Sequence, residues 1–355
     1  MTVDPILAFR RRSLAGALLL SLVTSGLVSC EKPPAPPPET GGFRLTDKFF
    51  DVKSLGNNSF ILLGYRSMMA KSDDGGANWK KLTPPTKRNL TRLAFADGKK
   101  GWGVGHEGII LTTENGGDTW TEQKSGTKNS LFDLAIMSPT NVWAIGDQSS
   151  VLHTTDGGQN WSVRKVEISM IGVREDMTLA ISDPIFYGVS CVDENTCWVV
   201  GEFGQIRFTK DGGQTWDAQH GNLLGPKFRD IMGLPTFLCV KARDAQHAVA
   251  VGTYGAIAST SDGVNWNWNQ TPVGAPLYDI RALPDGDYLA VGASGVVLRG
   301  NPDSGWKPAE TPPGVFTWIS ASDFDMQGHG VAGGGHGLIL TTTDFGKKWE
   351  WKANG

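Results

Sequence analysis

Short runs of alternating apolar and polar residues recur along most of the chain. In each unit an apolar run ends at a Gly, a turn of about two residues follows, and a second alternating run leads back, as in WGVGHEGIILTT from Trp102. A third run precedes this pair, as in LFDLAIMS from Leu131, and a fourth begins at a recurring Trp. Alternation with a period of two predicts β-strands joined by tight turns. Each unit is therefore expected to hold four short antiparallel strands.

A second pattern marks the boundary between the third and fourth runs of each unit. It reads Ser or Thr, any residue, Asp, any residue, Gly, two further residues and Trp, as in TKDGGQTW from Thr209 to Trp216. The third position is held by Asp74, Asn115, Asp156, Asp211, Asp262, Asp303 and Asp344, and the last by Trp79, Trp120, Trp161, Trp216, Trp266, Trp306 and Trp349. Seven copies of a four-stranded unit predict an all-β fold, a seven-bladed β-propeller of four-stranded antiparallel blades over residues 43–355.

We interpret this motif as a structural turn. The Asp side chain can accept hydrogen bonds from turn amides, and the Gly tolerates a positive φ. The Trp supplies apolar surface to bury against a neighbouring sheet. Seven equivalent active sites are implausible, so the repetition of the motif reflects the repetition of the blade.

The first 42 residues have a different character. Three arginines, Arg10 to Arg12, precede the apolar run Leu14 to Val28, which predicts a secretory signal peptide over residues 1–29. Leu-Val-Ser-Cys at 27–30 resembles a bacterial lipoprotein box, which implies a lipidated Cys30; an ordinary cleaved signal and a twin-arginine signal are the alternatives. Residues 30–42 form a proline-rich tether. These features predict an exported, lipid-anchored protein that faces the periplasm.

The net charge and the cysteines bear on which partners and which covalent bonds to expect. The formal net charge is −3, and residues 1–29 hold three Arg and one Asp, so the exported chain is more acidic still. This argues against a nucleic-acid partner.

Cys191 and Cys197 flank a polar turn and could form a disulfide, while Cys239 lies in an apolar run. No two His residues share a short metal-ligand spacing, so no metal site is expected.

The motif identifies the chain as similar to Asp-box (BNR) repeat proteins, which include sialidases, some β-glucan hydrolases, sortilin-type receptors and the photosystem II stability/assembly factors. The fuller pattern, Trp-x-Val-Gly-x-x-Gly-x-Ile-x-x-Thr-x-Asp-Gly-Gly-x-x-Trp, resembles the last family most and covers nearly all of residues 43–355. This resemblance implies a non-catalytic propeller that binds a membrane protein subunit and assists assembly or stability of a membrane complex, with no cofactor and no small-molecule substrate. It also implies a place in the thylakoid lumen, instead of the periplasm, if the host is photosynthetic.

One face of such a propeller is expected to carry the binding surface. The turns between second and third strands lie on the same side as the connections between blades, and their residues differ from blade to blade. The residues entering the innermost strands also differ, and they run Asp51, Arg92, Asp133, Gly188, Cys239, Asp279 and Trp318. From these positions and the longer connections we predict a partner-binding set of Arg66, Arg92, His106, Glu107, Asp133, Asp147, Arg174, Glu202, Phe228, Arg229, Tyr254, Asp279 and His336. The alternative is a solvated rim without a single ligand.

Two adjacent connections between blades are longer than the others. They cover roughly residues 162–185 and 217–236 and carry apolar residues such as Met170, Leu223 and Ile231. Apolar residues on long surface loops are costly unless they pack or bind. We therefore expect a ridge that grips a protein partner.

An enzyme is the alternative to a binding protein. Arg66, Arg92 and Arg281 could approach one face, as the three arginines of a sialidase do, but no Tyr–Glu pair accompanies them. Glu107, Asp133, Asp147 and Glu202 could supply the two carboxylates of an inverting glucanase. A glycan-active or glycan-binding propeller is therefore the alternative function.

Overall fold

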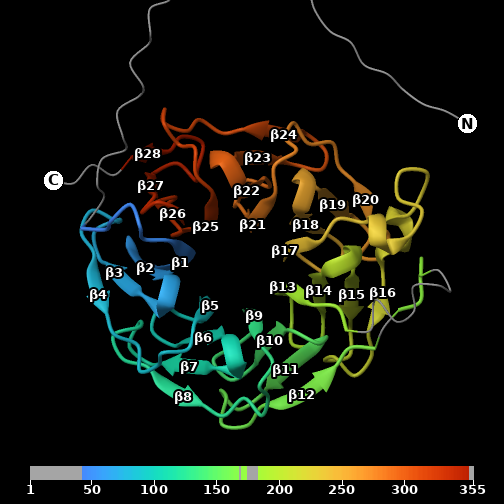
Figure 1. Ribbon diagram of the computed structural model, residues 1–355, viewed down its shortest axis with the longest axis horizontal. Helices are drawn as coiled ribbons and strands as arrows, with labels where there is room; N and C mark the ends of the chain where they lie inside the picture. Colours follow the sequence, from blue (N-terminus) through green and yellow to red (C-terminus); the bar gives the residue numbers. More distant parts are fainter. Residues whose placement is uncertain (1–41, 168, 174–182, 352–355) are drawn as a thin grey trace, which may run out of the picture. The chain divides into compact units, whose positions relative to one another are not determined.

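The alternating runs form seven four-stranded antiparallel sheets, arranged radially around a common axis (Figure 1). Residues of the innermost strands, Arg92, Asp133 and Asp279 among them, line a cavity on this axis, which we call the channel. A computed structural model describes residues 42–167, 169–173 and 183–351. These residues belong to one compact unit, Pro36–Gly355. The expected seven-bladed propeller is confirmed. Within the described residues, the helical turns are all 3-10 turns of three or four residues.

Each blade contributes its strands in chain order from the channel outward. The innermost strands are β1 (Phe49–Gly56), β5 (Leu90–Phe95), β9 (Leu131–Ile136), β13 (Phe186–Cys191), β17 (Phe237–Ala242), β21 (Leu277–Ala282) and β25 (Ile319–Phe324). The second strands are β2 (Ser59–Gly64), β6 (Gly101–Gly105), β10 (Val142–Gly146), β14 (Cys197–Gly201), β18 (Ala248–Gly252), β22 (Tyr288–Gly292) and β26 (Gly330–Gly334).

The outer half of each blade is shorter. The third strands are β3 (Met69–Ser72), β7 (Ile110–Thr113), β11 (Ser150–Thr154), β15 (Ile206–Thr209), β19 (Ile257–Thr260), β23 (Val297–Asn301) and β27 (Ile339–Thr342). The outermost strands are β4 (Lys80–Leu82), β8 (Thr121–Gln123), β12 (Ser162–Lys165), β16 (Asp217–Ala218), β20 (Asn267–Trp268), β24 (Gly305–Pro308) and β28 (Glu350–Trp351).

The core lies between neighbouring blades. The second strand of nearly every blade is buried along its whole length, because sheets pack against both of its faces. Trp102, Trp143 and Trp198, which sit on these strands, are completely buried. The buried apolar residues divide into seven clusters, one for each gap between blades. A propeller core is thus a ring of sheet-to-sheet interfaces, and each blade depends on its two neighbours.

The ring closes between the first and the last blade. Ser320 Oγ donates to the Phe49 carbonyl at 2.6 Å, and the Ser54 amide donates to Asp323 Oδ2 at 2.9 Å. Both blades are built from four consecutive strands, β1 to β4 and β25 to β28. The circle is therefore closed by side-by-side packing and side-chain hydrogen bonds rather than by a blade shared between the two ends of the described chain.

The repeated Asp-containing turns follow the expected hydrogen-bond pattern, as the first blade shows. Asp74 Oδ1 accepts from the Asn78 amide at 2.8 Å and from Ser72 Oγ at 2.8 Å. The Gly76 amide donates to Ser72 Oγ at 2.8 Å, and Trp79 Nε1 donates to the Gly76 carbonyl at 2.9 Å. The side chains of Ser, Asp and Trp thus satisfy the polar groups of a turn that no strand covers.

The sixth blade departs from this pattern. Asn301, two residues before Asp303, accepts from the amides of Asp303 and Ser304 at 3.0 and 2.8 Å. Asp303 was expected to close this turn, but the structure gives the role to Asn301. The local sequence NPDSGW has no Ser or Thr at its start, so a side-chain amide takes over the acceptor position.

Each of the two faces of the ring has its own set of turns. The Asp-containing turns lie beside the turns between first and second strands, since the Gly75 amide donates to the Asn58 carbonyl and the Gly116 amide to the Lys99 carbonyl. We call this side the Asp-box face. The turns between second and third strands contact the connections between blades, since the His106 amide donates to the Asn89 carbonyl. We call this side the variable face.

The predicted signal peptide, Cys30 and nearly all of the tether fall in residues 1–41, outside the described residues. Within the described part of the chain, no helix is long and apolar enough to cross a membrane.

Candidate functional site

The variable face carries seven turns that share an unusual backbone geometry. Five are 3-10 turns, namely η1 (Tyr65–Ser67), η2 (His106–Gly108), η4 (Glu202–Gly204), η7 (Thr253–Gly255) and η8 (Ala293–Gly295). In every blade the second residue after the Gly that ends the second strand has a positive φ of 53° to 59° and is not Gly; these residues are Arg66, Glu107, Gln148, Phe203, Tyr254, Ser294 and His336.

A side chain at positive φ is strained relative to Gly, by about 1 kcal/mol. Gly is abundant in this chain and follows immediately in most of these turns, as Gly108 and Gly255 do. The first left-handed position nevertheless carries seven different residue types, several of them exposed; Tyr254 is 79% exposed. Strain that persists where Gly would relieve it points to a use for the side chain.

A β-bulge at the start of every innermost strand adds a second set of side chains to this face. The pairing of innermost and second strands skips one residue in all seven blades. The skipped residues are Phe50, Thr91, Phe132, Tyr187, Leu238, Tyr278 and Ser320. A bulge takes a residue out of the alternating pattern and re-aims its side chain. None of the seven is buried.

Aromatic side chains from these bulges meet the turns. The Phe132 ring lies 5.4 Å from the Tyr187 ring and 6.2 Å from the His106 ring. The Phe50 ring lies 6.0 Å from Trp318, stacked, and 6.5 Å from Tyr65. We define Phe50, Phe132, Tyr187, Tyr278 and Trp318 as the aromatic mouth. Half-exposed aromatic residues of this kind are enriched in protein interfaces.

Sequence reasoning missed this feature, although the sequence contains a signal for it. In FFD, LFD and LYD an aromatic residue directly precedes the Asp at the channel (Phe50, Phe132 and Tyr278). Strict alternation puts these two neighbours on opposite sides of the sheet, and only the bulge brings both toward the axis.

The predicted partner-binding residues separate into several groups. Six are exposed on the variable face or its connections: Arg66, His106, Glu107, Arg229, Tyr254 and His336. Two accept backbone hydrogen bonds there, since Asp147 Oδ1 accepts from the Gln148 amide and Glu202 Oε2 from the Ile185 amide. Phe228 is half-buried against Trp268. Arg174 lies outside the described residues.

Three predicted residues are not on the exposed face. Arg92, Asp133 and Asp279 are buried together in the channel, where Arg92 Nε lies 3.1 Å from Asp133 Oδ1 and Arg92 Nη1 lies 3.8 Å from Asp279 Oδ1. Arg92 Nη1 also lies 3.5 Å from Asp51 Oδ1. These three side chains already pair inside the channel, so their place in the partner-binding set stays a prediction that their position does not favour.

Electrostatics agree with this pairing. Burial alone lowers the pKa of Arg92, but the carboxylates of Asp133, Asp51 and Asp279 outweigh it and hold this pKa well above its usual value. Burial is likewise the largest influence on Asp279, yet Arg281 and Arg92 lower the pKa of that carboxyl below its usual value. Asp133 is the exception, because burial outweighs Arg92 and raises the pKa of its carboxyl above the usual value. The cluster therefore favours the charged forms of Arg92 and Asp279 but not that of Asp133.

The seventh channel position is also different from the prediction. Ala321 pairs with Gly333 as Asp279 pairs with Val291, so Ala321 is the equivalent residue. Trp318 precedes the strand and belongs to the aromatic mouth. Ile319 is the equivalent of Leu277 and not of Ile280, so matching the two isoleucines displaced the sequence alignment by three positions.

The two long connections do lie side by side. The Ile231 amide donates to the Gly172 carbonyl at 3.2 Å, and His220 Nε2 contacts the Ile171 carbonyl at 3.2 Å. However, Leu223, Ile231 and Leu234 are buried in the cluster of the fourth and fifth blades. The expected apolar ridge is thus largely internal, and Met170, Ile171 and Met232 are its exposed large apolar residues among those described.

Three of the four carboxylates considered for a glucanase have partners in the structure, while Glu107 is exposed on its turn. Asp133 pairs with Arg92 and accepts from the Val189 amide, while Asp147 and Glu202 accept the amides given above. For the sialidase alternative, Arg92 and Arg281 both pair with Asp279 inside the channel, and Arg66 stands apart over the Tyr65 ring. Among the described residues, no group of three His, Cys, Asp or Glu side chains could hold a metal ion.

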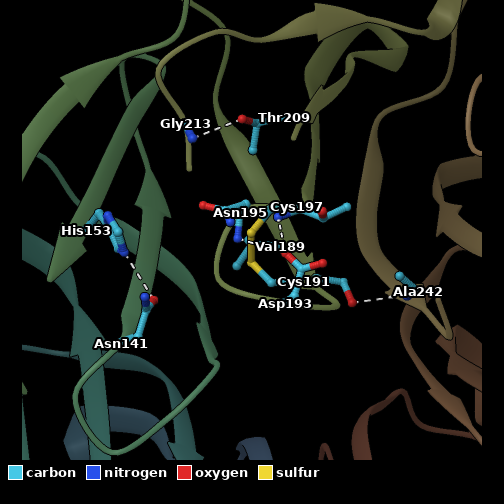
Figure 2. Close-up of a disulfide and its surroundings, with 12 residues drawn as sticks. Asn141, His153, Val189, Cys191, Asp193, Asn195, Cys197, Thr209, Gly213 and Ala242 are labelled. Carbon is cyan, nitrogen blue, oxygen red and sulfur yellow. Dashed lines mark hydrogen bonds between the residues drawn. A yellow bond between two sulfur atoms is a disulfide. The ribbon is translucent and has the colours of Figure 1, made fainter. Parts of the chain in front are cut away.

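The cysteines occupy defined places. Cys191 and Cys197 form a disulfide across the hairpin of β13 and β14 (Figure 2). Ser190, beside this disulfide, accepts from the Ala242 amide of the next blade at 3.0 Å. Cys239 is buried in the channel near Asp279, and burial raises the pKa of its thiol to about 12, which disfavours the reactive thiolate.

Known proteins match both the sequence and the fold. "Photosystem II assembly lipoprotein Ycf48" of Synechococcus sp. (strain CC9902) is 25% identical over 96% of this chain and 88% of its own length. Its counterpart in Synechococcus sp. (strain RCC307) is 34% identical, but the match spans only 29% of this chain and about a third, 32%, of that relative's length.

Solved structures share the propeller. "YCF48 bound to D1 peptide" superposes with a TM-score of 0.59 at 20% identity over 77% of this chain and 84% of that chain. An ancestral GH74 enzyme superposes with a TM-score of 0.66 at 13% identity over 90% of this chain and 47% of that chain. At such identities these likenesses concern the fold alone.

The family model described as "Photosynthesis system II assembly factor YCF48" matches residues 39–128, 74–170 and 120–313. These overlapping segments cover well over half of the chain and include the repeats from the first blade to the sixth. The chain therefore belongs to the YCF48 family of photosystem II assembly factors.

Proposed function

We propose that this protein is a non-catalytic assembly factor that binds an extended segment of a membrane protein subunit on its variable face. The observation that carries the proposal is the set of seven strained turn residues around the aromatic mouth. Family membership supports the role in assembly, and one solved relative is named as bound to a D1 peptide, which makes a photosystem II core subunit the first candidate partner.

The chemistry of the face fits a peptide better than a globular surface. Aromatic rings offer flat apolar area for side chains, and the turn tips offer charges of both signs in Arg66, Glu107 and His336. Burial raises the pKa of the Tyr187 phenol most, and the nearby carboxylates of Glu202 and Asp147 raise it further. Tyr187 therefore stays a neutral hydrogen-bond donor at physiological pH.

The proposed anchor is a lipid on Cys30 followed by the tether of residues 31–42. A lipid anchor and a proline-rich spacer would hold the propeller beside the membrane where a new subunit emerges. Labelling cells with a fatty-acid analogue tests this point, and a Cys30→Ser variant that stays membrane-bound would contradict it.

The binding experiment compares capture of a D1 peptide, and of native membrane proteins, by the wild type and by a Tyr65→Ser/Tyr254→Ser variant. Both tyrosines are exposed on the variable face, so their loss leaves the core intact. We expect at least about tenfold weaker capture, as for exposed aromatic anchors. The matched control is Val264→Ser on the Asp-box face, which is also exposed. Equal capture by all three proteins would contradict the proposal.

Lack of catalysis is part of the proposal and has a separate test. The engaged carboxylates of Asp133, Asp147 and Glu202 support it. Incubation with β-glucan and sialoside reporters should release no product above background. Release that depends on Asp133 or Glu202 would instead support a glycoside hydrolase.

A further inference from the structure

One of the seven interfaces between blades carries a charged side chain where the other six carry an apolar one. Arg207 pairs with Val199 inside the fourth blade and is only 1% exposed. The residues at the equivalent register of the other blades are all buried and apolar, namely Ala70, Leu111, Leu152, Ala258, Leu298 and Leu340. Val199 belongs to the cluster between the third and fourth blades, and directly paired residues share one side of a sheet. Arg207 therefore enters this interface, which we call the polar seam.

The charge of Arg207 is not balanced. Its Nε and Nη1 are enclosed without a hydrogen-bond partner, and among the described residues the guanidinium forms no ion pair. Burial lowers the pKa of Arg207 to about 10, whereas carboxylates hold the pKa of Arg92 in the channel above its usual value. Arg207 is therefore still charged at neutral pH, and a buried charge without a partner is unfavourable.

Two neighbouring polar side chains leave this charge unbalanced. Burial and then the charge of Arg207 lower the pKa of His220 to about 4, so His220 is neutral at pH 7. Its Nδ1 is enclosed without a hydrogen-bond partner, and so is Oε1 of Gln205, two residues before Arg207. Of the ten such side-chain atoms among the described residues, four belong to these three residues. Unsatisfied polar groups are thus concentrated at this one seam.

Hydrogen bonds cross the polar seam at its two margins. Beside the channel, the Val189 amide donates to Asp133 Oδ2 at 3.0 Å. At the outer side, Arg164 Nη1 donates to the Gly213 carbonyl at 3.0 Å. Between these margins the two blades are joined by the apolar cluster into which Arg207 projects. The buried charge therefore weakens the seam where apolar packing is its main support.

We propose that the polar seam is the place where the ring opens locally in the native protein. Opening any seam exposes apolar surface, but opening this one also hydrates the Arg207 guanidinium, which offsets part of the cost. Phe132 and Tyr187, whose rings lie 5.4 Å apart in the aromatic mouth, come from the two blades on either side. Opening would change the spacing of these rings. Only this last consequence rests on the proposed function, because it matters if the mouth binds a peptide.

The test measures how fast a buried reporter thiol reacts with a thiol reagent in the folded full-length protein. Ile145→Cys places the reporter in the polar seam, and Leu63→Cys places it at the equivalent position between the first and second blades. Both side chains are completely buried and equal in size. Such thiols react only when the structure opens, so we expect at least about tenfold faster labelling for Ile145→Cys. Mass spectrometry separates this signal from that of the native buried Cys239.

A second substitution removes the charge that is held responsible. Arg207→Met keeps a long side chain but no guanidinium. It should slow labelling of the Ile145→Cys thiol at least about tenfold and raise the midpoint of thermal unfolding by about 2–4 °C. The control is Leu152→Met, at the equivalent position of the third blade, which should change neither the labelling rate nor the midpoint appreciably.

Equal labelling rates for Ile145→Cys and Leu63→Cys would overturn the proposal. So would an Arg207→Met substitution that lowers the midpoint or leaves the labelling rate of Ile145→Cys unchanged. Peptide capture is a separate readout, so failure of capture with fast labelling intact would contradict the proposed function alone.

Discussion

Arg92 Nε lies 3.1 Å from Asp133 Oδ1, and this pair joins the second and third blades inside the channel. Replacing Arg92 with Met leaves Asp133 buried without its counter-charge. Removal of one partner of a buried pair costs about 3 kcal/mol of the free energy of unfolding. Urea denaturation measures this loss.

The double variant Arg92→Met/Asp133→Asn is the control, because it removes the orphaned charge. We expect it to recover much of the loss seen in Arg92→Met. Equal stability of Arg92→Met and the wild type would show that the pair is not a structural element of the channel.

Stability is expected to fall in acid because of the Asp-containing turns. Hydrogen bonds from Asn160 and Thr154 lower the pKa of Asp156 from its usual value of 3.8 to about 2. A lowered pKa in the folded state stabilises the protein above pH 4, and that contribution disappears as the pH falls toward 2. Urea midpoints at pH 7 and pH 3 measure it for the wild type and for Asp156→Asn.

Asn115 shows why Asn is the right replacement. It accepts from the Thr119 amide at 2.9 Å, as Asp156 does from the Asn160 amide, but it cannot ionise. The stability difference between the wild type and Asp156→Asn should therefore shrink as the pH falls. A difference that stays constant from pH 7 to pH 2 would be inconsistent with ionisation of Asp156 in this range.

Trp266 is the most instructive of the recurring tryptophans. It is completely buried, and its Nε1 donates to Gln219 Oε1 at 2.9 Å. Trp266→Ala should cost about 3–5 kcal/mol through the cavity that it opens. Trp266→Phe should cost less, since it keeps most of the apolar volume. A loss below about 1 kcal/mol for the Ala variant, by urea denaturation, would refute the role of this Trp in joining blades.

The disulfide of Cys191 and Cys197 closes a loop with a sequence separation of six. Constraint of the unfolded chain by such a short loop corresponds to about 2 kcal/mol. The Cys191→Ser/Cys197→Ser variant should lose about this much, and dithiothreitol should destabilise the wild type but not the variant. Indifference of the wild type to reductant would indicate that the bond does not form in solution.

Much of the fold can be predicted from the sequence, because the alternation of apolar and polar residues and the repeated Trp depend only on residues close together in the chain. The turn formed by Ser72, Asp74 and Trp79, for instance, depends on neighbours within a few residues, and its place in the blade follows directly. The same locality explains the error at Asp303, where a single missing hydroxyl passes the role to Asn301.

The candidate site is harder to predict from the sequence, because it depends on the pairing register of the strands and on contacts between residues far apart in the chain. Arg92 and Asp133 are 41 positions apart, and only closure of the ring brings them together. The bulges at Phe50 and Phe132 shift one residue out of the alternation, and the aromatic residue before Asp that marks them has a meaning only once the bulge is known. Ile231 looked like an exposed loop residue because nothing nearby in the sequence shows the core against which it packs.

The strained turns on the variable face provide the most direct test of the account. In a variant with Arg66, Glu107 and Tyr254 all replaced by Gly, relief of the positive φ should raise stability by about 0.5 kcal/mol per site, after the entropy cost of Gly. The same variant should capture the D1 peptide or native membrane partner at least about tenfold less well than the wild type. Higher stability with weaker capture is the predicted result. Unchanged capture would contradict the claim that these residues are kept strained for binding.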